Sequence, residues 1–471
     1  LYQRRLEGIR FHMGVFTNLS RDHLDFHGSM EAYFAAKKLL FTRFLREDGQ
    51  AIVLTGKGTQ ERDWGKQLCR ELTAERPSIQ LISYGLAQQD DHRRQPVVSA
   101  DAVEQDMQGF SCRIRLTGKA FAFRSGLIGQ HNVLNILTAA GVGTALGMAP
   151  EQIIAGLAQA GQVPGRLERV RLPGISVDEQ PCVLVDYAHT PDALQNVLQA
   201  LRPLAKKRLI CVFGCGGDRD RGKRPLMGRI ATASANIAVL TSDNPRAEDP
   251  QAILQEVLQG VRSVHAVELP ADELFNDQDQ LRKPPCYICI ADRKTAIHTA
   301  CALAAPEDIV LLAGKGHEEY QIIGKERLFF DDRLEALNGL LRWNPRHLVR
   351  AVQAVDQGEA EEQDMVGPYM FQHVSTDTRT LSAGDIFVAL AGENFDGHDY
   401  LCAAAKAGAT AVVVQQEIEL DRHELPKDMM ILRVQDTLQA LHRLAAYRRR
   451  LLHPDLPLIA ITGSCGKTTV K

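Results

Sequence analysis

Five short apolar segments within residues 165–335 constrain the fold of this chain more than any other feature. Each has the composition of a buried strand and ends in a polar or glycine-rich turn, and helical patterns separate the segments. They are 181–190 (PCVLVDYAHT), 208–220 (RLICVFGCGGDRD), 235–246 (ANIAVLTSDNPR), 286–295 (CYICIADRKT) and 308–318 (DIVLLAGKGHE). Strands that alternate with helices form a mostly parallel sheet with helices on both faces. We therefore predict a doubly wound, Rossmann-like α/β domain.

The rest of the chain also has α/β character. Residues 1–150 combine a strand-like run at 51–56 (AIVLTG) with helical patterns such as Met30–Phe44. An irregular stretch at 343–350 (WNPRHLVR) interrupts the pattern, and a small α/β unit follows over about 348–453. At 471 residues the chain is long enough for several domains.

Composition and charge argue against some classes of function. The formal net charge of −3 argues against a general nucleic-acid-binding surface, and Arg448–Arg450 is interpreted as the solvated C-terminus of a helix. No apolar run approaches the roughly 18 residues of a membrane span. Cys286 and Cys289 form a C-x-x-C pair inside an apolar strand, which favours buried, reduced thiols over zinc. We predict a cytoplasmic protein.

Three of the predicted strands lead into loops that suit an amino acid as ligand. Arginine offers a bidentate fork for a carboxylate, while carboxylate and amide oxygens can receive an ammonium group. Because the carboxyl ends of parallel strands meet at one edge of a sheet, we expect these loops to share one site. Each loop alone is equally compatible with a plain turn and a surface salt bridge. The residues are Arg219, Lys223 and Arg224 after the second strand, Asp243, Asn244 and Arg246 after the third, and Gly314 and Glu318 after the fifth.

Two further clusters suit metal or phosphate chemistry. His23 and its neighbouring carboxylates, followed by Lys37 on a helix, could hold Mg²⁺ or position a phosphate; the alternative is a hydrogen-bonded loop with a solvated lysine. A strand-like run at 456–462 leads into a glycine turn whose backbone N–H groups can face a phosphate, with a lysine and a threonine for charge and Mg²⁺. We expect a nucleotide-binding unit that begins here and is cut off at Lys471. Its residues are Gly463, Gly466, Lys467 and Thr468.

Several ordered motifs resemble the Mur ligases of peptidoglycan synthesis. Over residues 1–340 they are VFTNLSRDHLD, AAK, GQHNVLN, PGRLE, VDYAHTPDAL, GCGGDRDRGKRPLMG, SDNPRAEDP and AGKGHEEYQ. They are most similar to the family member that adds meso-diaminopimelate to UDP-MurNAc-L-Ala-D-Glu. Residues 348–471, with VSTDTRTLSAGDIFVALAGENFDGHD and ITGSCGKTTVK, resemble the start of the member that next adds D-Ala-D-Ala. The chain thus resembles the middle of a fusion of two ligases.

The resemblance implies five parts. They are a partial central ATPase domain (1–155), a C-terminal amino-acid-binding domain (156–340), a linker (341–347), the N-terminal UDP-substrate domain of a second ligase (348–454) and the start of its central domain with the P-loop (455–471).

The resemblance also implies a chemistry with ATP and Mg²⁺. ATP would phosphorylate a substrate carboxylate, and the amine of the incoming amino acid would attack the acyl phosphate. Lys37 matches a lysine that is carbamylated by CO₂, and carbamate oxygens suit Mg²⁺ better than an ammonium does. Lys37 and His23 would hold the metal of the first ligase, and the Thr468 hydroxyl could join the shell of a Mg²⁺ ion at the terminal P-loop.

The implied binding residues follow from the same motifs. The nucleotide contacts would be Asn135, Arg166, Asp186, Gly463, Gly466, Lys467 and Thr468. The contacts to UDP-MurNAc-peptides would be Gln3, Arg5, Thr376, Asp377, Arg379 and Asn394. The contacts to the incoming amino acid would be Arg219, Asp243, Asn244, Arg246, Gly314 and Glu318. Arg246 would pair with the far carboxylate of meso-diaminopimelate.

Three hypotheses stay open at this point. The first is a segment of an ATP-dependent amide ligase that is inactive alone, because no P-loop precedes Thr17. The second is a circularly permuted single ligase, in which the terminal P-loop docks against the front half of the chain. The third is a non-catalytic binding module, in which replacing Lys37 or Arg246 has no effect.

Overall fold

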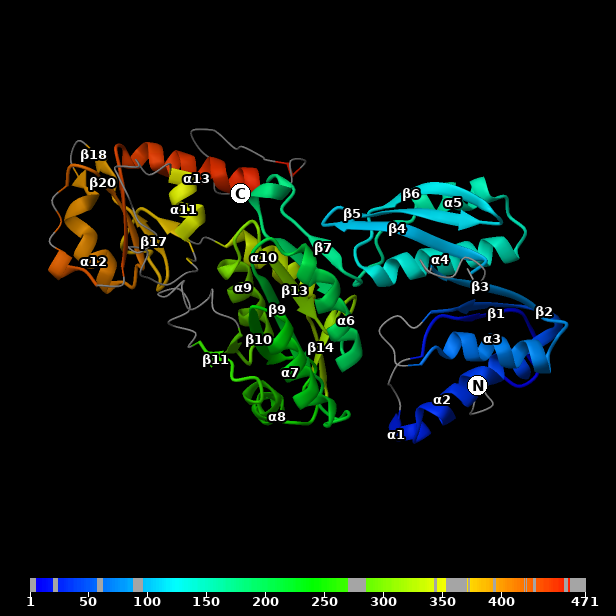
Figure 1. Ribbon diagram of the computed structural model, residues 1–471. Coiled ribbons are helices and arrows are strands. Elements are labelled where there is room, and N and C mark those ends of the chain that lie inside the picture. The colour runs from blue at the N-terminus through cyan, green and yellow to red at the C-terminus, as the bar shows by residue number, and fades with distance from the viewer. Residues whose placement is uncertain are drawn as a thin grey trace, which may run out of the picture. The chain divides into compact units, whose positions relative to one another are not determined.

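The computed structural model describes most of the chain. The described residues are 6–19, 24–56, 62–87, 96–269, 285–342, 345–352, 371, 373–392, 395–418, 420, 422–426, 429–452 and 456–457. The chain divides into two compact units, Leu1–Leu167 with Thr190–Leu204 and Glu168–His189 with Ala205–Lys471. Both units are α/β structures, as the sequence predicts (Figure 1).

The first unit is built on a six-stranded mixed sheet in the order β1-β2-β3-β4-β5-β6. Its strands are β1 (Phe11–Phe16), β2 (Leu45–Leu54), β3 (Gln80–Leu86), β4 (Val98–Asp106), β5 (Gly109–Leu116) and β6 (Lys119–Ser125). Strands β1 to β4 pair in parallel, and β4, β5 and β6 pair antiparallel. Successive residues of β2 enter different cores, since Ala51 and Val53 belong to one and Ile52 to the other. The sheet is therefore buried on both faces.

Helices cover the two faces of this sheet (Figure 1). Phe34 and Phe41 of α2 share the core of Val53, whereas Val133 and Leu137 of α4 share the core of Ile52. Helix α2 begins where Ser29 accepts a hydrogen bond from Ala32 N (3.1 Å). The helices of this unit are α1 (Leu24–His27), α2 (Met30–Thr42), α3 (Trp64–Glu75), α4 (Gln130–Ala145), α5 (Pro150–Ala158) and α6 (Pro191–Leu201), with a 3₁₀ turn at Arg202–Leu204.

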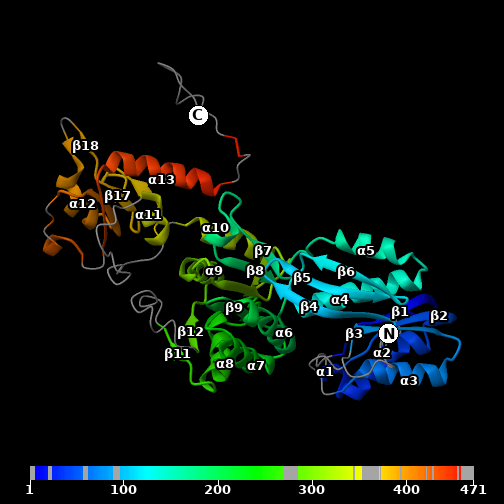
Figure 2. The same ribbon diagram turned by 45° about the horizontal axis from the view of Figure 1, so that its top comes forward.

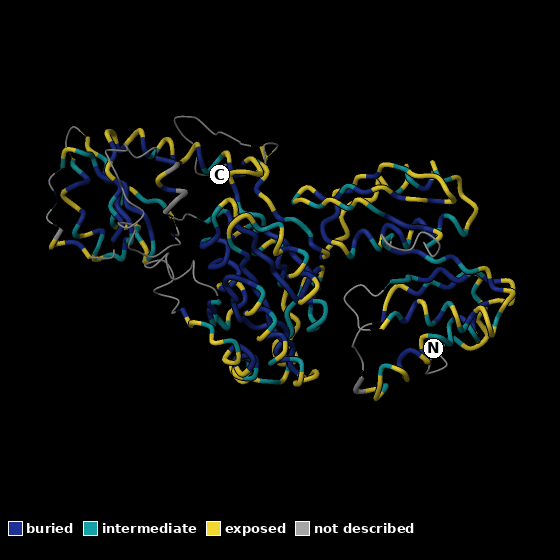
Figure 3. The backbone as a smooth tube through the Cα atoms, in the orientation of Figure 1, coloured by how far each residue is buried: buried dark blue, intermediate teal, exposed yellow. Residues whose placement is uncertain are grey.

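The second unit contains a seven-stranded sheet in the order β11-β12-β10-β9-β13-β8-β7. The five predicted strands are present as β8 (Cys182–Asp186), β9 (Leu209–Cys215), β10 (Ile237–Ser242), β12 (Cys286–Cys289) and β13 (Ile309–Ala313). They pair in parallel, β11 (Val267–Glu268) adds a parallel edge, and β7 (Glu168–Val170) adds an antiparallel one. Every residue of β9 is buried, as expected for a central strand between two helical layers (Figure 3).

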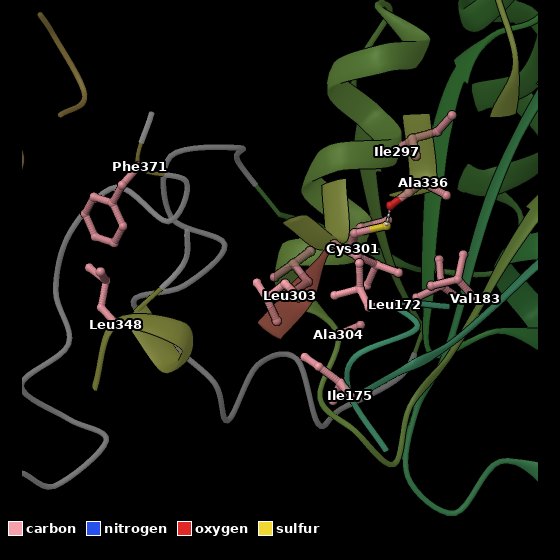
Figure 4. Packing of buried hydrophobic residues seen from close by; sticks show 14 of the residues in the cluster. Leu172, Ile175, Val183, Ile297, Cys301, Leu303, Ala304, Ala336, Leu348 and Phe371 are labelled. Atoms are coloured by element: carbon pink, nitrogen blue, oxygen red, sulfur yellow. Dashed lines mark hydrogen bonds between the residues drawn. The ribbon is translucent and has the colours of Figure 1, made fainter. Parts of the chain in front are cut away.

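The crossover helices of this sheet are capped by side chains that the sequence supplies. Asp249, Asp292 and Asp331 each precede a helix and accept a hydrogen bond from a backbone N–H of its first turn. In the core, Cys301 Sγ donates to Ala336 O (3.8 Å), and Leu172 and Val183 lie close by (Figure 4). The helices are α7 (Lys223–Ser234), α8 (Pro250–Arg262), α9 (Arg293–Leu303) and α10 (Asp332–Leu341) (Figure 2). The 3₁₀ turn Val177–Glu179 and the hairpin of β14 (Tyr320–Ile323) and β15 (Glu326–Phe329) belong to the same part of the chain.

The same unit also contains a smaller parallel sheet in the order β16-β17-β20-β21. Its strands are β16 (Val374–Ser375), β17 (Ile386–Val388), β20 (Ala411–Gln415) and β21 (Met430–Val434). Its other elements are α11 (Pro345–Val352), the pair β18 (Ala391–Gly392) and β19 (Phe395–Asp396), α12 (Leu401–Lys406), α13 (Thr437–Leu451) and 3₁₀ turns at Gly397–Tyr400 and Arg422–Glu424. This supports the prediction of an α/β structure beyond residue 348.

The run of three arginines at 448–450 lies in the last turn of helix α13. The arginine run closes helix α13 as predicted and Arg450 is exposed, but Arg448 is half-buried and donates to Leu341 O. Burial lowers the pKa of Arg448.

Cys286 and Cys289 are free thiols whose pKa values are raised by burial. Within the described part of the chain, no helix has the length and apolar character needed to cross a bilayer.

The close packing of α7 on α8 leads to a stability prediction. A Cβ at Gly260 of α8 would lie 1.7 Å from Pro225 O, so Gly260→Ala should push the helices apart and destabilise them by about 1–3 kcal/mol. Gly156 in α5 is exposed and a Cβ there meets nothing within 4 Å, so Gly156→Ala should instead stabilise its helix by about 0.5–1 kcal/mol. Native-state hydrogen exchange in α5, α7 and α8 measures both effects locally. Unchanged exchange in α7 and α8 of Gly260→Ala would contradict the close approach.

Candidate amino-acid-binding site

The parallel strands of the larger sheet in the second unit bring polar residues to one edge. Strand β8 ends at Asp186, and β10 and β13 lead directly into Asp243 and Gly314. Gly314 N donates to Asp186 O (3.0 Å), which ties two strand ends together. Gly314 has a φ of +120°, which only glycine adopts easily, and a Cβ there would lie 4.0 Å from Asp243 Cγ. A glycine at this position therefore leaves room beside the carboxylate.

Asn244 connects the loop after β10 to the loop after β13. Its Nδ2 donates to Glu318 Oε2 (3.2 Å), while its Oδ1 accepts from Lys315 Nζ (3.0 Å) and from Ile322 N (3.0 Å). Asn244 is buried, whereas Glu318 is half-buried. The predicted residues Asn244 and Glu318 are thus in direct contact.

Lys315 lies beneath these loops and has no assigned role in the sequence prediction. Its side chain is fully buried, donates to Tyr320 O (2.7 Å) and forms an ion pair with Asp243 (Nζ to Oδ1, 3.3 Å). Burial lowers the pKa of Lys315, and the nearby Asp243 carboxylate opposes that shift. A lysine between two glycines gave no signal of burial, because one of its partners, Asn244, lies 71 residues away in the chain.

The backbone of Arg246 has an uncommon conformation, which hydrogen bonds to a neighbouring hairpin hold in place. Its φ is +53°, and it is bonded to hairpin β14–β15 through Arg246 N to Ile322 O (3.0 Å) and Gly324 N to Arg246 O (2.7 Å). Its Nη1 donates to Gly217 O (2.7 Å). Within the described residues, the guanidinium of Arg246 bonds to Gly217 O and Asn244 O through Nη1, so Nε and Nη2 can still meet an anion.

Arg219, in the loop after β9, and Arg224, at the start of α7, have different environments. Arg219 is exposed, and its Cγ would lie 3.7 Å from a Cβ at Gly216, while Arg246 Nη1 would lie 2.9 Å from the same Cβ. Arg219 and Arg246 therefore flank one glycine. Arg224 is fully buried between Glu248 and Glu256, with ion pairs of 2.8 and 2.9 Å, so its interpretation as an anion-binding residue was wrong. Hydrogen bonds from Arg224 hold the pKa of Glu248 at about 2.

A second charged pair, absent from the sequence prediction, supports the end of β13. Arg293 and Asp332 are fully buried and joined by two hydrogen bonds, from Nε (2.8 Å) and Nη2 (2.6 Å). Arg293 Nη2 also donates to Ala313 O (3.1 Å), one residue before Gly314. The pair thereby anchors the strand end that carries the candidate site.

An aromatic group lies beside Asp186. The Tyr187 ring centroid is 4.5 Å from that of His189 and 5.5 Å from that of His317. Lys223, predicted to bind an anion, instead donates to His189 O (2.8 Å). Asp186 Oδ1 accepts from Ala188 N (2.9 Å), which orients the carboxylate predicted to contact a nucleotide.

The remaining predicted residues lie elsewhere. In the first unit, Lys37 is exposed on α2 with Nζ 5.1 Å from the Tyr33 ring, and Asn135 is exposed on α4 and donates to Asn132 Oδ1 (3.1 Å). Arg166, also in the first unit, is close enough to His131 to lower its pKa, although burial is the larger cause. The predicted residues Gln3, Arg5, His23, Asn394, Gly463, Gly466, Lys467 and Thr468 lie outside the described residues.

The predicted UDP-substrate residues of the smaller sheet form one turn after β16. Arg379 and Asp377 form an ion pair (Nη2 to Oδ2, 2.7 Å), and Arg379 N donates to Asp377 Oδ1 (3.0 Å). These bonds lower the pKa of Asp377 to about 2. Thr376 is exposed beside them, and Arg379 is 87 % exposed.

Three family models match successive parts of this chain. The Mur ligase middle domain matches residues 1–143, the glutamate ligase domain matches 165–316, and the Mur ligase catalytic domain matches 371–449. The chain contains domains of the Mur ligase family. The glutamate ligase match covers the loops after β8, β9 and β10 and the start of the loop after β13.

Curated relatives agree with these matches. The chain is 44% identical over 335 residues to a UDP-N-acetylmuramoyl-L-alanyl-D-glutamate–2,6-diaminopimelate ligase of Geobacter metallireducens, covering 71% of the chain and 62% of the relative. It is 42% identical over 341 residues to the ligase of that name from Synechococcus elongatus, covering 71% and 60%. A solved structure of a ligase with this name is 33% identical to the chain, with a TM-score of 0.46. The match covers 72% of this chain and 62% of the chain in that structure. The chain thus spans about three fifths of the length of these relatives.

The buried Arg293–Asp332 pair leads to a second stability prediction. Arg293→Met would leave the Asp332 carboxylate buried without its partner, and removing one member of such a pair typically costs about 3–5 kcal/mol. Lys294→Met is the matched control, because Lys294 is half exposed and its ion pair with Glu335 is long (3.6 Å); it should change stability by less than about 1 kcal/mol. Denaturant unfolding followed by hydrogen exchange in β13 measures the difference. Equal stabilities for the two variants would contradict an anchoring role for Arg293.

Proposed function

We propose that residues 1–340 belong to a ligase that joins meso-diaminopimelate to UDP-MurNAc-L-Ala-D-Glu. The observation that carries this proposal is the arrangement of Arg219, Arg246, Asn244 and Glu318 at the carboxyl edge of one sheet. The Arg246 guanidinium and the aliphatic part of the Arg219 side chain flank Gly216, and a carboxylate bonded to Asn244 lies on the neighbouring loop. The names and the identity of the curated relatives support the same substrates.

The charges of the site match the far end of this amino acid. Its remote carboxylate would pair with Arg246, whose φ of +53° aims the side chain at the loop of Gly217, and Arg219 is exposed on the same loop. Its remote ammonium would meet Glu318 and Asp243. Holding the remote group in this way would present the other amine to the activated carboxylate and lower the entropic cost of the reaction step.

The activation step would belong to the other proposed residues. ATP supplies the phosphoryl group that converts the substrate carboxylate into a reactive acyl phosphate. Asn135, Arg166 and Asp186 are the proposed nucleotide contacts within the described residues. An ammonium on Lys37 does not fit a cation site, and in the described structure its Nζ lies over Tyr33, so Mg²⁺ at this position would require the carbamate.

We further propose that residues 371–449 belong to a second ligase, whose partner would be D-Ala-D-Ala. The observation that favours this is the order of the family matches, because a catalytic-domain match follows the glutamate ligase match along the chain. Thr376, Asp377 and Arg379 would then contact its UDP-MurNAc-peptide.

Binding of two related amino acids tests the first proposal. L-Lysine lacks the remote carboxylate of meso-diaminopimelate, so the 471-residue chain should bind meso-diaminopimelate more tightly. Arg246→Ala should weaken the binding of meso-diaminopimelate about ten- to a hundredfold, the usual range for a charged hydrogen bond, and leave the affinity for L-lysine unchanged. Ligand-observed NMR measures both affinities. Arg221→Ala is the control, because Arg221 lies in the same loop but pairs with Glu256. No preference for meso-diaminopimelate, or no effect of Arg246→Ala, would contradict the proposal.

The second proposal has its own binding test. Arg379→Ala should weaken binding of UDP-MurNAc-tripeptide about tenfold in calorimetry, through loss of a charged contact to phosphate. Lys406→Ala removes an exposed charge from the same small sheet's helix α12 and should have no effect. Equal affinities for wild type and Arg379→Ala would argue against a UDP-substrate site at this turn.

A further inference from the structure

The Lys315 ammonium lies close to three oxygens, two from the loop after β10 and one from strand β14. An ammonium has three donors, and Nζ lies 3.0 Å from Asn244 Oδ1, 2.7 Å from Tyr320 O and 3.3 Å from Asp243 Oδ1. The side chain is fully buried. Two hydrogen bonds therefore join the ammonium to neutral oxygens of two segments, and its contact with Asp243 is an ion pair.

The consequence of this bonding lies at Asn244. An asparagine amide can in principle be turned by 180°, and its neighbours decide which end is oxygen. Here Oδ1 receives two donors, Lys315 Nζ and Ile322 N. Turning the amide would set its NH₂ group against both donors, so only one orientation satisfies all groups. In that orientation Nδ2 must face Glu318, and it lies 3.2 Å from Oε2.

The charge of Lys315 is expensive to keep at this depth. Burying an ammonium costs several kcal/mol unless it is paired, and an apolar side chain of similar volume would fill the same space without that cost. Within the described residues, the ammonium forms one ion pair, at 3.3 Å, while its two shorter contacts are to neutral oxygens. A role in orienting those neutral groups explains why the residue is a lysine.

We propose that Lys315 is a positioning residue for the acceptor amino acid. It fixes the Asn244 amide, and through Nδ2 it holds the Glu318 carboxylate in the orientation that receives the ligand's ammonium. This inference rests on the proposed function, since it concerns the same site. Gln321 Nε2 bonded to Asp243 O (2.7 Å) completes the frame from the hairpin side.

The first test is binding of meso-diaminopimelate to the 471-residue chain and its variants by ligand-observed NMR. Lys315→Met should weaken binding about tenfold, the loss of one charged hydrogen bond acting through Asn244. The double variant Lys315→Met/Glu318→Gln should bind no more weakly than Glu318→Gln alone, because both changes act on one carboxylate. Lys325→Met, an exposed lysine in the hairpin turn, should bind like wild type. Additive losses in the double variant would overturn the positioning role.

A second measurement needs no variant at the buried site. With ¹⁵N-labelled asparagine and the assignment made through Asn244→Ser, the two Nδ2 protons of wild type should give separate resonances protected from exchange. A single, rapidly exchanging signal would overturn the inference even if Lys315→Met fails to fold. The two proposals fail in distinguishable ways. Wild type that does not bind meso-diaminopimelate contradicts the proposed function, whereas tight binding unaffected by Lys315→Met contradicts only the role of Lys315.

Discussion

The parallel pairing of β8, β13, β9 and β10 is the constraint on which the rest of this structure depends. Parallel strands cannot be joined by a tight turn, so each needs a crossover, and all carboxyl ends meet at the same edge. Asp186, Asp243 and Gly314 are far apart in the chain and yet follow neighbouring strands. The interior beneath them is apolar, so every charge at this edge must be paired or exposed.

The two edges of the sheet handle charge differently. At the amino edge, Arg208 and Asp308 precede β9 and β13 and bind each other with Nε (3.0 Å) and Nη2 (2.6 Å), while Arg208 N bonds the second carboxylate oxygen (2.9 Å). These bonds join Arg208 and Asp308 to each other, and the pair stabilises the fold. At the carboxyl edge, buried Lys315 and Arg293 hold loop atoms in place, while Arg219 and Glu318 above them keep surface exposure. The Arg208–Asp308 pair therefore has a structural role, whereas the buried Lys315 and Arg293 support the loops of the candidate site.

The strands and the loops that follow them could be predicted from the sequence, because hydrophobic runs and turn residues are local signals. The prediction that Asn244 and Glu318 share a site needed one additional rule, the common edge of parallel strands. The sequence could not predict which charges are buried. Arg219 lies in the loop after β9, and Arg224 lies five residues later in the first turn of α7. Both are arginines, but of the two only Arg224 pairs with Glu248, in the loop before α8, and with Glu256 on α8. Lys315 and Arg293 were missed for the same reason, because their partners are set by tertiary packing.

Backbone strain at the same edge explains why Arg224 is a buried arginine and not an apolar residue. Asp218 and Arg246 both have a positive φ, at +52° and +53°, and such residues typically cost about 1–3 kcal/mol each unless the surroundings hold them. Glycine is needed next to them, since a Cβ at Gly217 would lie 1.9 Å from Pro245 O. Asp218 is held by its backbone N–H to Glu248 Oε1 (2.6 Å) and by its carboxylate to Ala247 N (3.2 Å).

Glu248 is in turn fixed by two hydrogen bonds from Arg224, which also donates to Gly216 O (3.2 Å). One guanidinium therefore clamps both loops that carry Arg219 and Arg246, through bonds that an apolar side chain could not make. The strained conformation of Arg246 and the buried charge of Arg224 are two parts of one arrangement, in which hydrogen bonds from a buried guanidinium stabilise the loops that hold Arg246 at a positive φ.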